Sequence, residues 1–327
     1  MKVLFVGGTG IISSACSRLA VERGYDLYLL CRGESPRPAP AGATLLKADI
    51  NNESAVAAML NGHHFDAVVN FIVFEPSQIE RDIRLFFGRT RQYVFISSAS
   101  TYKKPLNHWP ITESTPLCNP YWDYSRNKIA CEAVLMHAYV QRGFPATIIR
   151  PSHTYDETLL PFDPYLGGGT VLSRMREGKP VIVHGDGTSL WVLTHNTDFA
   201  RGFVPLLGDQ RTLGEALHIT SNELLSWNEI YRLVGQAAGV KPSLVHVPSS
   251  AIARAHASWG AGLLGDKAHS VIFDNTKLRS FVPHYVPQIP FHRAVQSIVD
   301  YHQANPNFEP VNRELDELMD QLAQRWS

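Results

Sequence analysis

The strongest indication of the fold is a stretch at the start of the chain, Lys2-Val3-Leu4-Phe5-Val6-Gly7-Gly8-Thr9-Gly10. Its first part is a short apolar run without a solvent face, which is typical of a strand buried on both faces of a parallel sheet. Apolar residues then recur at helical spacing from Ile11 to Ala20, and Gly24 follows as a helix stop. The stretch therefore predicts a strand, a tight glycine turn and a helix, in that order.

The glycines of this turn have the properties that a bound dinucleotide needs. Gly7 can adopt backbone angles closed to other residues, and Gly10 has no side chain to keep a pyrophosphate away from the amides at the helix N-terminus. Ser13 stands where a third glycine often allows close packing of the helix on the strand. The predicted contacts of the turn are Gly7, Thr9, Gly10, Ile11 and Ile12. An ordinary glycine-rich loop is the alternative, because short motifs of this kind match often.

The residues that follow the second and third strands bear on the choice of coenzyme. Leu27–Leu30 is the second predicted strand, and Arg32 comes just after it, where an enzyme selecting NAD usually has a carboxylate for the ribose 2′-hydroxyl. An arginine there can pair with the 2′-phosphate of NADP, so NADP is the favoured coenzyme and NAD the alternative. Asp49 and Ile50 follow the third strand, where an adenine contact is expected. The competing interpretation of Arg32 is a solvated loop residue.

The composition is that of a compact enzyme without a polyanionic partner. The chain has 327 residues, 44% of them hydrophobic, with 30 basic and 30 acidic residues. A protein bound to phosphate backbones should carry a basic surplus, so we expect no nucleic acid. The four cysteines form no CxxC pair, and the 14 histidines form neither H-x-x-x-H nor H-E-x-x-H, so we expect reduced thiols and no metal site. No apolar run approaches membrane-spanning length and Met1 leads straight into the first strand, so we expect a cytoplasmic protein without a signal peptide.

Strand and helix alternate along the first half of the chain, which predicts an α/β fold. Further strands are predicted at 44–46, 66–71, 93–96, 146–150 and 180–184, and helices at 55–60, 78–87 and 121–142. We expect a Rossmann-type doubly wound parallel sheet with a smaller, mixed α/β C-terminal substrate-binding region. The dinucleotide-binding domain is expected over 1–150 with returning segments near 181–218, and the substrate-binding region over 151–180 and 219–327. The pattern loosens around 167–169, and the apolar residues of 315–326 form one stripe of a helix that docks on its own subunit.

Taken together, motifs spread over most of the chain resemble those of the extended short-chain dehydrogenases/reductases, the group that includes sugar-nucleotide epimerases and dehydratases. They are the Gly7–Gly10 turn, Asn70 at the end of the fourth strand, the run Ile96–Tyr102, Tyr124 with Lys128, Arg150-Pro151, Gly185-Asp186-Gly187, and Thr194-His195 followed by Asp198. The resemblance implies an NAD(P)-dependent enzyme with coenzyme contacts at Asn70, Lys128 and Pro151. It also implies a homodimer, which paired long helices commonly build in the family.

The predicted catalytic residues are Ser98, Tyr124 and Lys128. A secondary alcohol gives up hydride only if its proton also leaves, and a phenol with a reference pKa of ~10 is a poor base at neutral pH. Lys128 lies one helical turn from Tyr124, so its ammonium can stabilise the phenolate. In the family, the residue at the position of Ser98 hydrogen-bonds the substrate oxygen. The competing interpretation is structural, with a snorkelling lysine on an amphipathic helix and a serine that satisfies backbone at a strand end.

Several residues depart from the family pattern and bear on the substrate. Ala99 and Ser100 stand where 4,6-dehydratases place an acid and a glutamate, so dehydration by that route is not expected. Where many epimerases have an arginine that grips a diphosphate, this chain has Trp191 nearby, which can stack on a ring but cannot neutralise phosphate. A simpler sugar, polyol or small ketone therefore competes with a sugar nucleotide. The expected substrate contacts are Ser100, His153 and Trp191, with His153 also the candidate for a second acid/base and with 266–269 and 273–275 as further candidate segments.

Three functional classes follow. The favoured class is an NAD(P)-dependent oxidoreductase or epimerase acting on a secondary alcohol or ketone of a sugar-like substrate. An RNA-binding relative and a redox-sensing relative without turnover are the alternatives. The neutral charge argues against the first alternative, and the intact Ser98, Tyr124 and Lys128 argue against the second. Net consumption of the coenzyme distinguishes a reductase from an epimerase.

Overall fold

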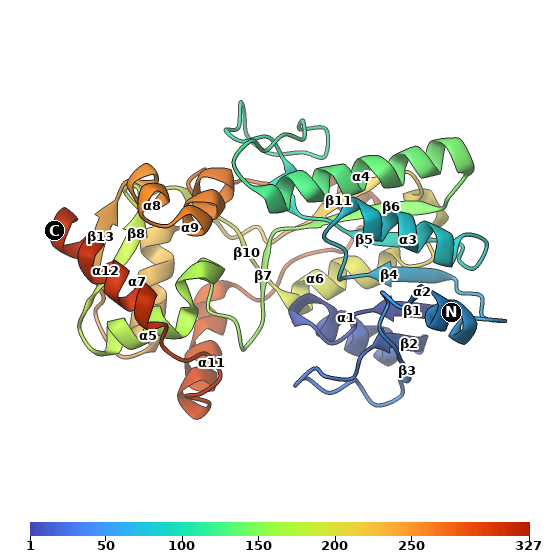
Figure 1. Cartoon of the computed structure of the whole chain (residues 1–327), viewed down its shortest axis with the longest axis horizontal. Coiled ribbons are helices and arrows are strands. Elements are labelled where there is room, and N and C mark those ends of the chain that lie inside the picture. The colour runs from blue at the N-terminus through green and yellow to red at the C-terminus, as the bar shows by residue number, and fades with distance from the viewer.

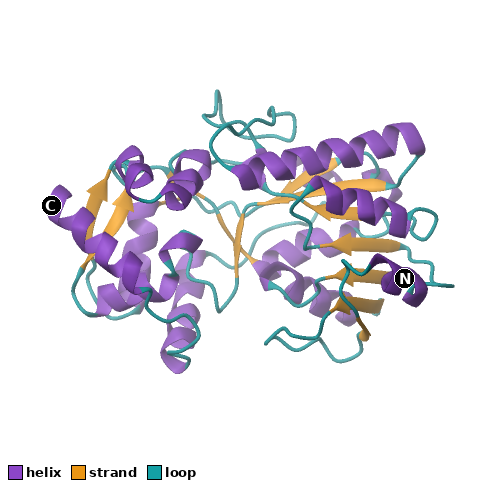
Figure 2. Ribbon diagram, in the orientation of Figure 1, coloured by secondary structure: helices purple, strands orange, loops and turns teal.

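The molecule has two lobes that lie side by side (Figure 1), and the chain begins in one and ends in the other. The computed structural model describes residues 1–327, apart from the side chain of Pro164. The larger lobe holds a sheet layered between helices, whereas the smaller lobe is mostly helical around short strands (Figure 2). Strands β7 and β10 lie between the two lobes in Figure 1.

The sheet of the larger lobe has seven parallel strands in the order β11-β6-β5-β4-β1-β2-β3. Its strands are β1 (Lys2–Val6), β2 (Asp26–Cys31), β3 (Thr44–Lys47), β4 (Ala67–Asn70), β5 (Tyr93–Ile96), β6 (Ala146–Pro151) and β11 (Ala216–Ile219). The order reverses direction between β1 and β4, and ligands of such sheets bind at the carboxyl ends of the strands beside this reversal. The predicted Rossmann-type fold is confirmed.

Helices cover both faces of this sheet, which explains why its strands are apolar throughout. The helices are α1 (Ile11–Glu22), α2 (Glu53–Met59), α3 (Pro76–Phe86), α4 (Asp123–Arg142) and α6 (Asn196–Phe203). Val3 and Phe5 of β1 belong to the core with α1 and α6, whereas Leu4 and Val6 belong to the core on the opposite face. Alternate side chains of one strand therefore enter two different cores, as the unbroken apolar run predicts.

The smaller lobe is built on short strand pairs. Its strands are β8 (Pro180–His184), β9 (Leu190–Trp191), β12 (Leu225–Ser226) and β13 (Ser243–Val247), while β7 (His153–Tyr155) and β10 (Leu193–His195) lie between the two lobes. Strand β8 pairs with β13, β7 with β10, and β9 with β12. The helices are α5 (Gly168–Arg176), α7 (Trp227–Ala237), α8 (Ser249–Ala255), α9 (Ala257–Gly262), α11 (Phe291–Ala304) and α12 (Arg313–Trp326), while α10 (Thr276–Phe281) contacts β11 of the larger lobe.

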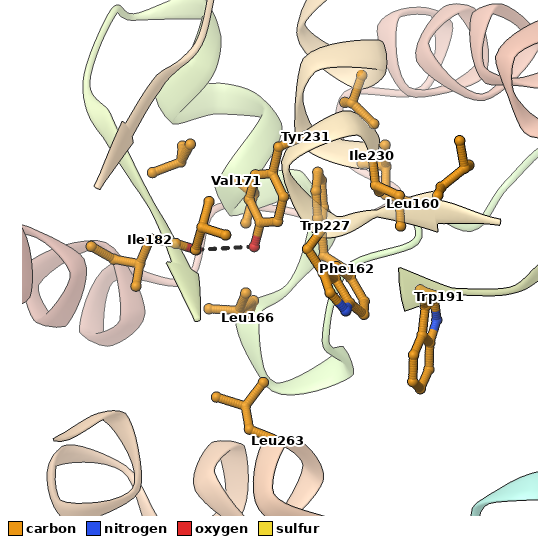
Figure 3. Close-up of a cluster of buried hydrophobic side chains, with 14 of the residues drawn as sticks. Leu160, Phe162, Leu166, Val171, Ile182, Trp191, Trp227, Ile230, Tyr231 and Leu263 are labelled. Carbon is orange, nitrogen blue, oxygen red and sulfur yellow. Dashed lines mark hydrogen bonds between the residues drawn. The ribbon is translucent and has the colours of Figure 1, made fainter. Parts of the chain in front are cut away.

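A buried cluster holds this lobe together (Figure 3). Phe162 and Tyr231 pack with ring centroids 4.7 Å apart, and the Tyr231 hydroxyl donates a hydrogen bond of 3.0 Å to the Ile182 carbonyl. Trp191 lies beside Trp227, at 5.3 Å between ring centroids, at one edge of the cluster. Close packing in the cluster thus holds Trp191 in a fixed position on the side that faces the other lobe.

Two sequence expectations need correction in this lobe. The returning segment was predicted to start at 181, but β8 pairs with β13 in the smaller lobe, and the chain rejoins the large sheet's lobe at α6. The loose pattern around 167–169 begins helix α5, whose first amides are bound by the Glu309 carboxylate at 2.8 Å and 3.1 Å. A Cβ at Gly169 would lie 1.8 Å from the Glu309 carbonyl oxygen. Glycine is therefore needed at this position because the backbone at Glu309 passes very close to it, and not because the segment forms a loop.

The last helix follows its predicted pattern. Leu315, Met319 and Leu322 of α12 are buried, and the helix contacts β8 and β13. Trp326, which was expected in the stripe, is 38% exposed. Among the described residues, no helix combines the length and the apolar character that a membrane crossing requires.

Candidate active site

The glycine turn joins β1 to α1 with a backbone that few other residues could adopt. Gly7 has φ +80°, and a Cβ on it would lie 2.7 Å from Ile72. The Ser13 hydroxyl donates to the Gly7 carbonyl at 2.6 Å and accepts from the Gly10 amide at 2.8 Å. Ser13 therefore ties the two ends of the turn together, and its small size lets α1 start close to the strand.

Three pockets follow one another along the carboxyl ends of the strands. The first, of 600 Å³, is lined by the ends of β2 and β3, and the second, of 310 Å³, by the start of α1 and the end of β5. These two share Gly7, Ile72 and Phe74. The third, also of 310 Å³, lies against the smaller lobe and shares Ser98, Tyr124, Pro151 and Ser152 with the second. A continuous crevice thus runs from the adenosine side of the sheet, through a middle pocket, to a terminal pocket.

Most of the residues predicted to bind the coenzyme line the first two pockets. The first is lined by Gly7, Thr9, Arg32, Asp49 and Ile50, and the second by Gly7, Gly10, Ile11, Ile12, Lys128 and Pro151. A Cβ on Gly10 would meet only Ser13 Oγ, at 3.3 Å, so the helix N-terminus stays open towards the crevice. The long shape, the open helix end and the glycine turn fit a dinucleotide. Arg32 pairs with Glu34 at 3.2 Å, and both side chains are about two-thirds exposed.

Asn70 lies beneath the crevice and does not line it. It is fully buried, its amide donates to Asp82 at 2.5 Å, and its oxygen accepts the Ile72 amide at 2.9 Å. Asp82 also accepts hydrogen bonds from Tyr93 and Arg81, so its buried charge is satisfied. This network holds the loop after β4, including Ile72, against the glycine turn. Its role is to position residues that face the crevice.

Tyr124 and Ser98 stand at the junction between the middle and terminal pockets. Tyr124 comes from the first turn of α4, while Ser98 follows β5. Burial raises the pKa of Tyr124 to about 12, a hydrogen bond with Ser98 counteracts this rise, and the negative charge of Asp266 adds to it. The phenol is therefore protonated at neutral pH. Ser98 Oγ is also 2.9 Å from Ser100 Oγ, to which Ser125 donates at 2.8 Å.

Lys128 lies on the same face of α4 as Tyr124, one helical turn further along, and its side chain lines the middle pocket. Its Nζ donates to the carbonyls of Val73 at 2.6 Å and Ile96 at 2.8 Å, and it lies 5.7 Å from the centroid of the Tyr124 ring. Burial lowers the pKa of Lys128 to about 8. The two carbonyl contacts fix the ammonium at the edge of the pocket, where one further hydrogen can face a ligand.

The terminal pocket contains the predicted substrate residues Ser100, His153 and Trp191. Trp191 Nε1 donates to His153 Nδ1 at 3.2 Å. Because an indole can only donate, Nδ1 carries no proton and a neutral His153 has its hydrogen on Nε2. Burial, with a contribution from the charge of Lys267, lowers the pKa of His153 to about 3. His153 is therefore a neutral hydrogen-bond donor near pH 7, which does not suit the acid/base role suggested for it from sequence.

The structure adds wall residues that the sequence did not single out individually. Trp122 lines the terminal pocket two residues before Tyr124, and the centroids of the two rings are 4.8 Å apart. Asp266 and Lys267 line it from the first of the two suggested segments, and Phe273 from the second. No group of three or more metal-binding side chains occurs among the described residues.

Comparison with known proteins gives the same class of fold. A curated relative, 2′-dehydrokanamycin reductase of Streptomyces kanamyceticus, is 26% identical over 81% of this chain and 72% of its own length. A second, the chloroplast stem-loop binding protein of 41 kDa b from Arabidopsis thaliana, is 25% identical over 75% of this chain and 65% of its own length. The structure of UDP-glucuronic acid 4-epimerase from Bacillus cereus, in complex with UDP-glucuronic acid and NAD, superposes with a TM-score of 0.71 at 18% identity, covering 93% of this chain and 100% of that chain.

The family assignment rests on the match of a family model. The model of the family described as "NAD dependent epimerase/dehydratase family" matches residues 3–219, from the first strand of the large sheet to its last. This span holds the glycine turn, Ser98, Tyr124 and Lys128, and a curated relative named above is a reductase. With a seven-stranded Rossmann-type sheet and a crevice along its carboxyl edge, the chain belongs to the NAD-dependent epimerase/dehydratase family of enzymes.

Proposed function

We propose that the protein is an NADP-dependent reductase that converts a ketone of a sugar-like substrate into a secondary alcohol. The observation that carries this proposal is the position of Tyr124 and Ser98, whose side chains line both the pocket suited to the nicotinamide end of a dinucleotide and the terminal pocket. A substrate in the terminal pocket can therefore present its reacting carbon to the coenzyme and its oxygen to these two hydroxyl groups.

The protonation of Tyr124 favours the reducing direction. Reduction of a ketone leaves negative charge on its oxygen, and a neutral phenol is the state that can protonate that oxygen. Burial and the charge of Asp266 both keep the phenol of Tyr124 neutral, since they raise its pKa. Oxidation of an alcohol needs the phenolate, which the same two effects disfavour.

Each predicted catalytic side chain has a distinct task in this scheme. NADPH, held along the first two pockets, would supply the hydride for the carbonyl carbon. Ser98 donates a hydrogen bond to the substrate oxygen and orients it, while Tyr124 transfers its hydroxyl proton to that oxygen. Lys128, fixed by the Val73 and Ile96 carbonyls, holds positive charge beside the phenol while it is anionic. The phenol then regains its proton from solvent.

Arg32 supports NADP over NAD. It lines the adenosine-side pocket, is mostly exposed, and has only Glu34 as a charged partner among the described residues. An exposed pair of this kind is worth little, so a 2′-phosphate can displace Glu34 at small cost. We expect NADPH to bind at least tenfold more tightly than NADH, and Arg32→Asp to remove that preference.

The test of the proposed function is the stoichiometry of coenzyme use. Purified protein is incubated with NADPH and a panel of keto-hexoses, methyl keto-glycosides and UDP-keto-hexoses. One NADPH should be oxidised for each alcohol formed. Interconversion of two epimers without net oxidation of NADPH would assign the protein as an epimerase instead.

Two further predictions concern partners. The homodimer expected from the family is tested by light scattering on the purified protein, which should give twice the mass of one chain. A nucleic-acid-binding function is the second candidate, because one relative is named as a stem-loop binding protein. The equal numbers of basic and acidic residues argue against it, and salt-dependent retention of a stem-loop RNA would favour it.

A further inference from the structure

The wall of the terminal pocket contains a short segment with an unusual backbone. Leu263–Lys267 is a π-helical turn, and its last two residues, Asp266 and Lys267, line the pocket. π-Helical turns are rare and occur frequently at functional sites, because they turn side chains in directions that an α-helix does not allow. This turn places a carboxylate and an ammonium beside each other on one pocket wall.

The turn is held rigidly from both lobes. The Lys267 carbonyl accepts hydrogen bonds from His184 at 3.0 Å, Trp227 at 3.1 Å and Ser189 at 3.2 Å. From the other side, the Asn119 amide donates to the Gly265 carbonyl at 2.6 Å. Such support keeps a binding group in one orientation before the ligand arrives, which lowers the entropy cost of binding.

A Cβ on Gly265 would lie 2.7 Å from Trp122 Cβ, so the turn packs directly against Trp122, which also lines the pocket. An added methyl group would push Asp266 and Lys267 away from Trp122.

Lys267 is buried, and the charged partner of its ammonium among the described residues is Asp163. Its Nζ lies 3.4 Å from Asp163 and is close to the rings of Trp122 and Trp191, at 5.4 Å and 5.8 Å from their centroids. Aromatic faces stabilise a cation without using its N–H groups. The N–H groups of Lys267 that do not face Asp163 thus remain available to a molecule in the pocket.

Two other groups on the walls complete a set of hydrogen-bonding positions. His153 presents its Nε2 hydrogen, since Trp191 occupies Nδ1. Asp266 is an acceptor whose nearest cation, Lys104, is 3.5 Å away. Donors at Lys267 and His153, an acceptor at Asp266 and aromatic side chains around them match the mixed polar and apolar surface of a sugar ring.

The charges of the pocket argue against a diphosphate. Lys267 is already balanced by Asp163, and Lys104 by Asp266, so the wall carries no surplus positive charge. A diphosphate would bring about two negative charges into a partly buried site without a free arginine or lysine to meet them, which is unfavourable. Neutral hydroxyl groups need only the hydrogen bonds that this wall offers.

We propose that Lys267, His153 and Asp266 bind neighbouring hydroxyl groups of an uncharged sugar ring, so that the substrate is a free sugar or a glycoside rather than a sugar nucleotide. This inference rests on the proposed function, since it assigns the substrate class of the same site. It makes Lys267 the residue that determines specificity.

The experiment measures binding by calorimetry, with and without saturating NADP⁺. The probes are the methyl glycosides of glucose, galactose and mannose, and the matching UDP-glucose and UDP-galactose. The variants are Lys267→Met and the double variant Lys267→Met/Asp163→Asn, which removes both charges together and avoids a buried unpaired carboxylate. Lys241→Met changes an exposed lysine of the same lobe and serves as the matched control.

At least one methyl glycoside should bind wild type and the Lys241 control equally, and bind both Lys267 variants at least tenfold more weakly. UDP-sugars should bind no more tightly than the matching methyl glycoside. A tenfold preference for a UDP-sugar, an unchanged glycoside affinity in the double variant, or the absence of binding by all three methyl glycosides would each overturn the inference. Failure of the proposed function is read separately, as an absence of NADPH binding or of stoichiometric NADPH oxidation.

Discussion

Burial sets the protonation of the titratable side chains that surround the terminal pocket. Tyr124 is kept as a neutral phenol, His153 as a neutral imidazole, and the pKa of Lys128 is lowered to about 8. In each case removal from water is the largest cause, because it disfavours the charged form. The site therefore has fewer charges than its residue types suggest.

Replacement of the proposed proton donor tests its role at the residue scale. Tyr124→Phe should lower kcat by roughly 10²- to 10⁴-fold, the range for loss of one general acid, and leave the affinity for NADPH unchanged. Steady-state kinetics and a coenzyme titration measure the two effects. Tyr121→Phe, three residues earlier and 43% exposed, is the control and should retain full activity. Equal activity of the two variants would exclude Tyr124 as the proton donor.

The pH dependence of stability tests a buried histidine behind the pocket. Burial lowers the pKa of His184 to about 4, so the folded protein binds this proton less readily than the unfolded chain. Because the folded pKa is depressed, full stability holds above the unfolded value of about 6.5 and falls as pH drops towards 4, by about 3 kcal/mol for this one group.

Urea unfolding between pH 7 and pH 4 measures this loss. His184→Gln can keep a donor to the Lys267 carbonyl but cannot be protonated. The variant should therefore lose less stability over this range than wild type does. If the free energy of unfolding falls equally with pH in wild type and in His184→Gln, His184 is not the group responsible.

At the scale of elements, helix ends and turns in the smaller lobe depend on partners that are distant in sequence. Helix α5 begins with glycines and has no side-chain cap of its own, and its first amides are bound by Glu309, about 140 residues away. The π-helical turn likewise takes its hydrogen bonds from other elements. Such elements form only once the lobe has packed.

Removal of the distant cap of α5 should therefore destabilise the protein. Glu309→Ala leaves two amides without their acceptor, at a cost of about 1 kcal/mol, as for the loss of an N-cap. Glu309→Gln keeps an acceptor and should cost less. Glu317→Ala, an exposed position on α12, is the control. A denaturation midpoint in Glu309→Ala equal to that of the control would contradict this account.

At the scale of the whole molecule, a loop of the larger lobe crosses the adenosine end of the crevice to reach the smaller lobe. Gly33, Glu34 and Ser35 line the first pocket, and Ser35 donates to the Thr9 carbonyl at 3.4 Å. Two residues later, Arg37 pairs with the buried Asp156 at 2.9 Å and also contacts Thr158. This crossing ties the two lobes together over the predicted coenzyme site.

Release of a bound dinucleotide should then require the Arg37 contact to open. Arg37→Ala should raise the dissociation rate of NADPH roughly tenfold, equivalent to about 1.4 kcal/mol, with little change in the association rate. Stopped-flow fluorescence of bound NADPH measures both rates. Arg23→Ala, which removes an exposed arginine at the far end of α1, is the control. The same dissociation rate in wild type and Arg37→Ala would exclude the loop as a barrier to release.

The Rossmann-type sheet and the expected positions of Ser98, Tyr124 and Lys128 could be predicted from the amino-acid sequence. These follow from short-range features: the unbroken apolar run of β1 requires two cores, the glycine turn requires a positive φ at Gly7, and a spacing of four residues places Tyr124 and Lys128 on one helix face. Short-range patterns of this kind depend on backbone geometry that neighbouring residues set.

The residues that line the terminal pocket could be identified only in the folded protein. Trp122, Trp191 and Lys267 come from distant parts of the chain, and their contacts depend on how two lobes pack. Contacts between elements also place Asn70 below the crevice, where it bonds Asp82, and place the hydrogen of His153 on Nε2, because Trp191 donates to Nδ1. These properties arise from burial and from long-range hydrogen bonds, which no local spacing in the sequence encodes.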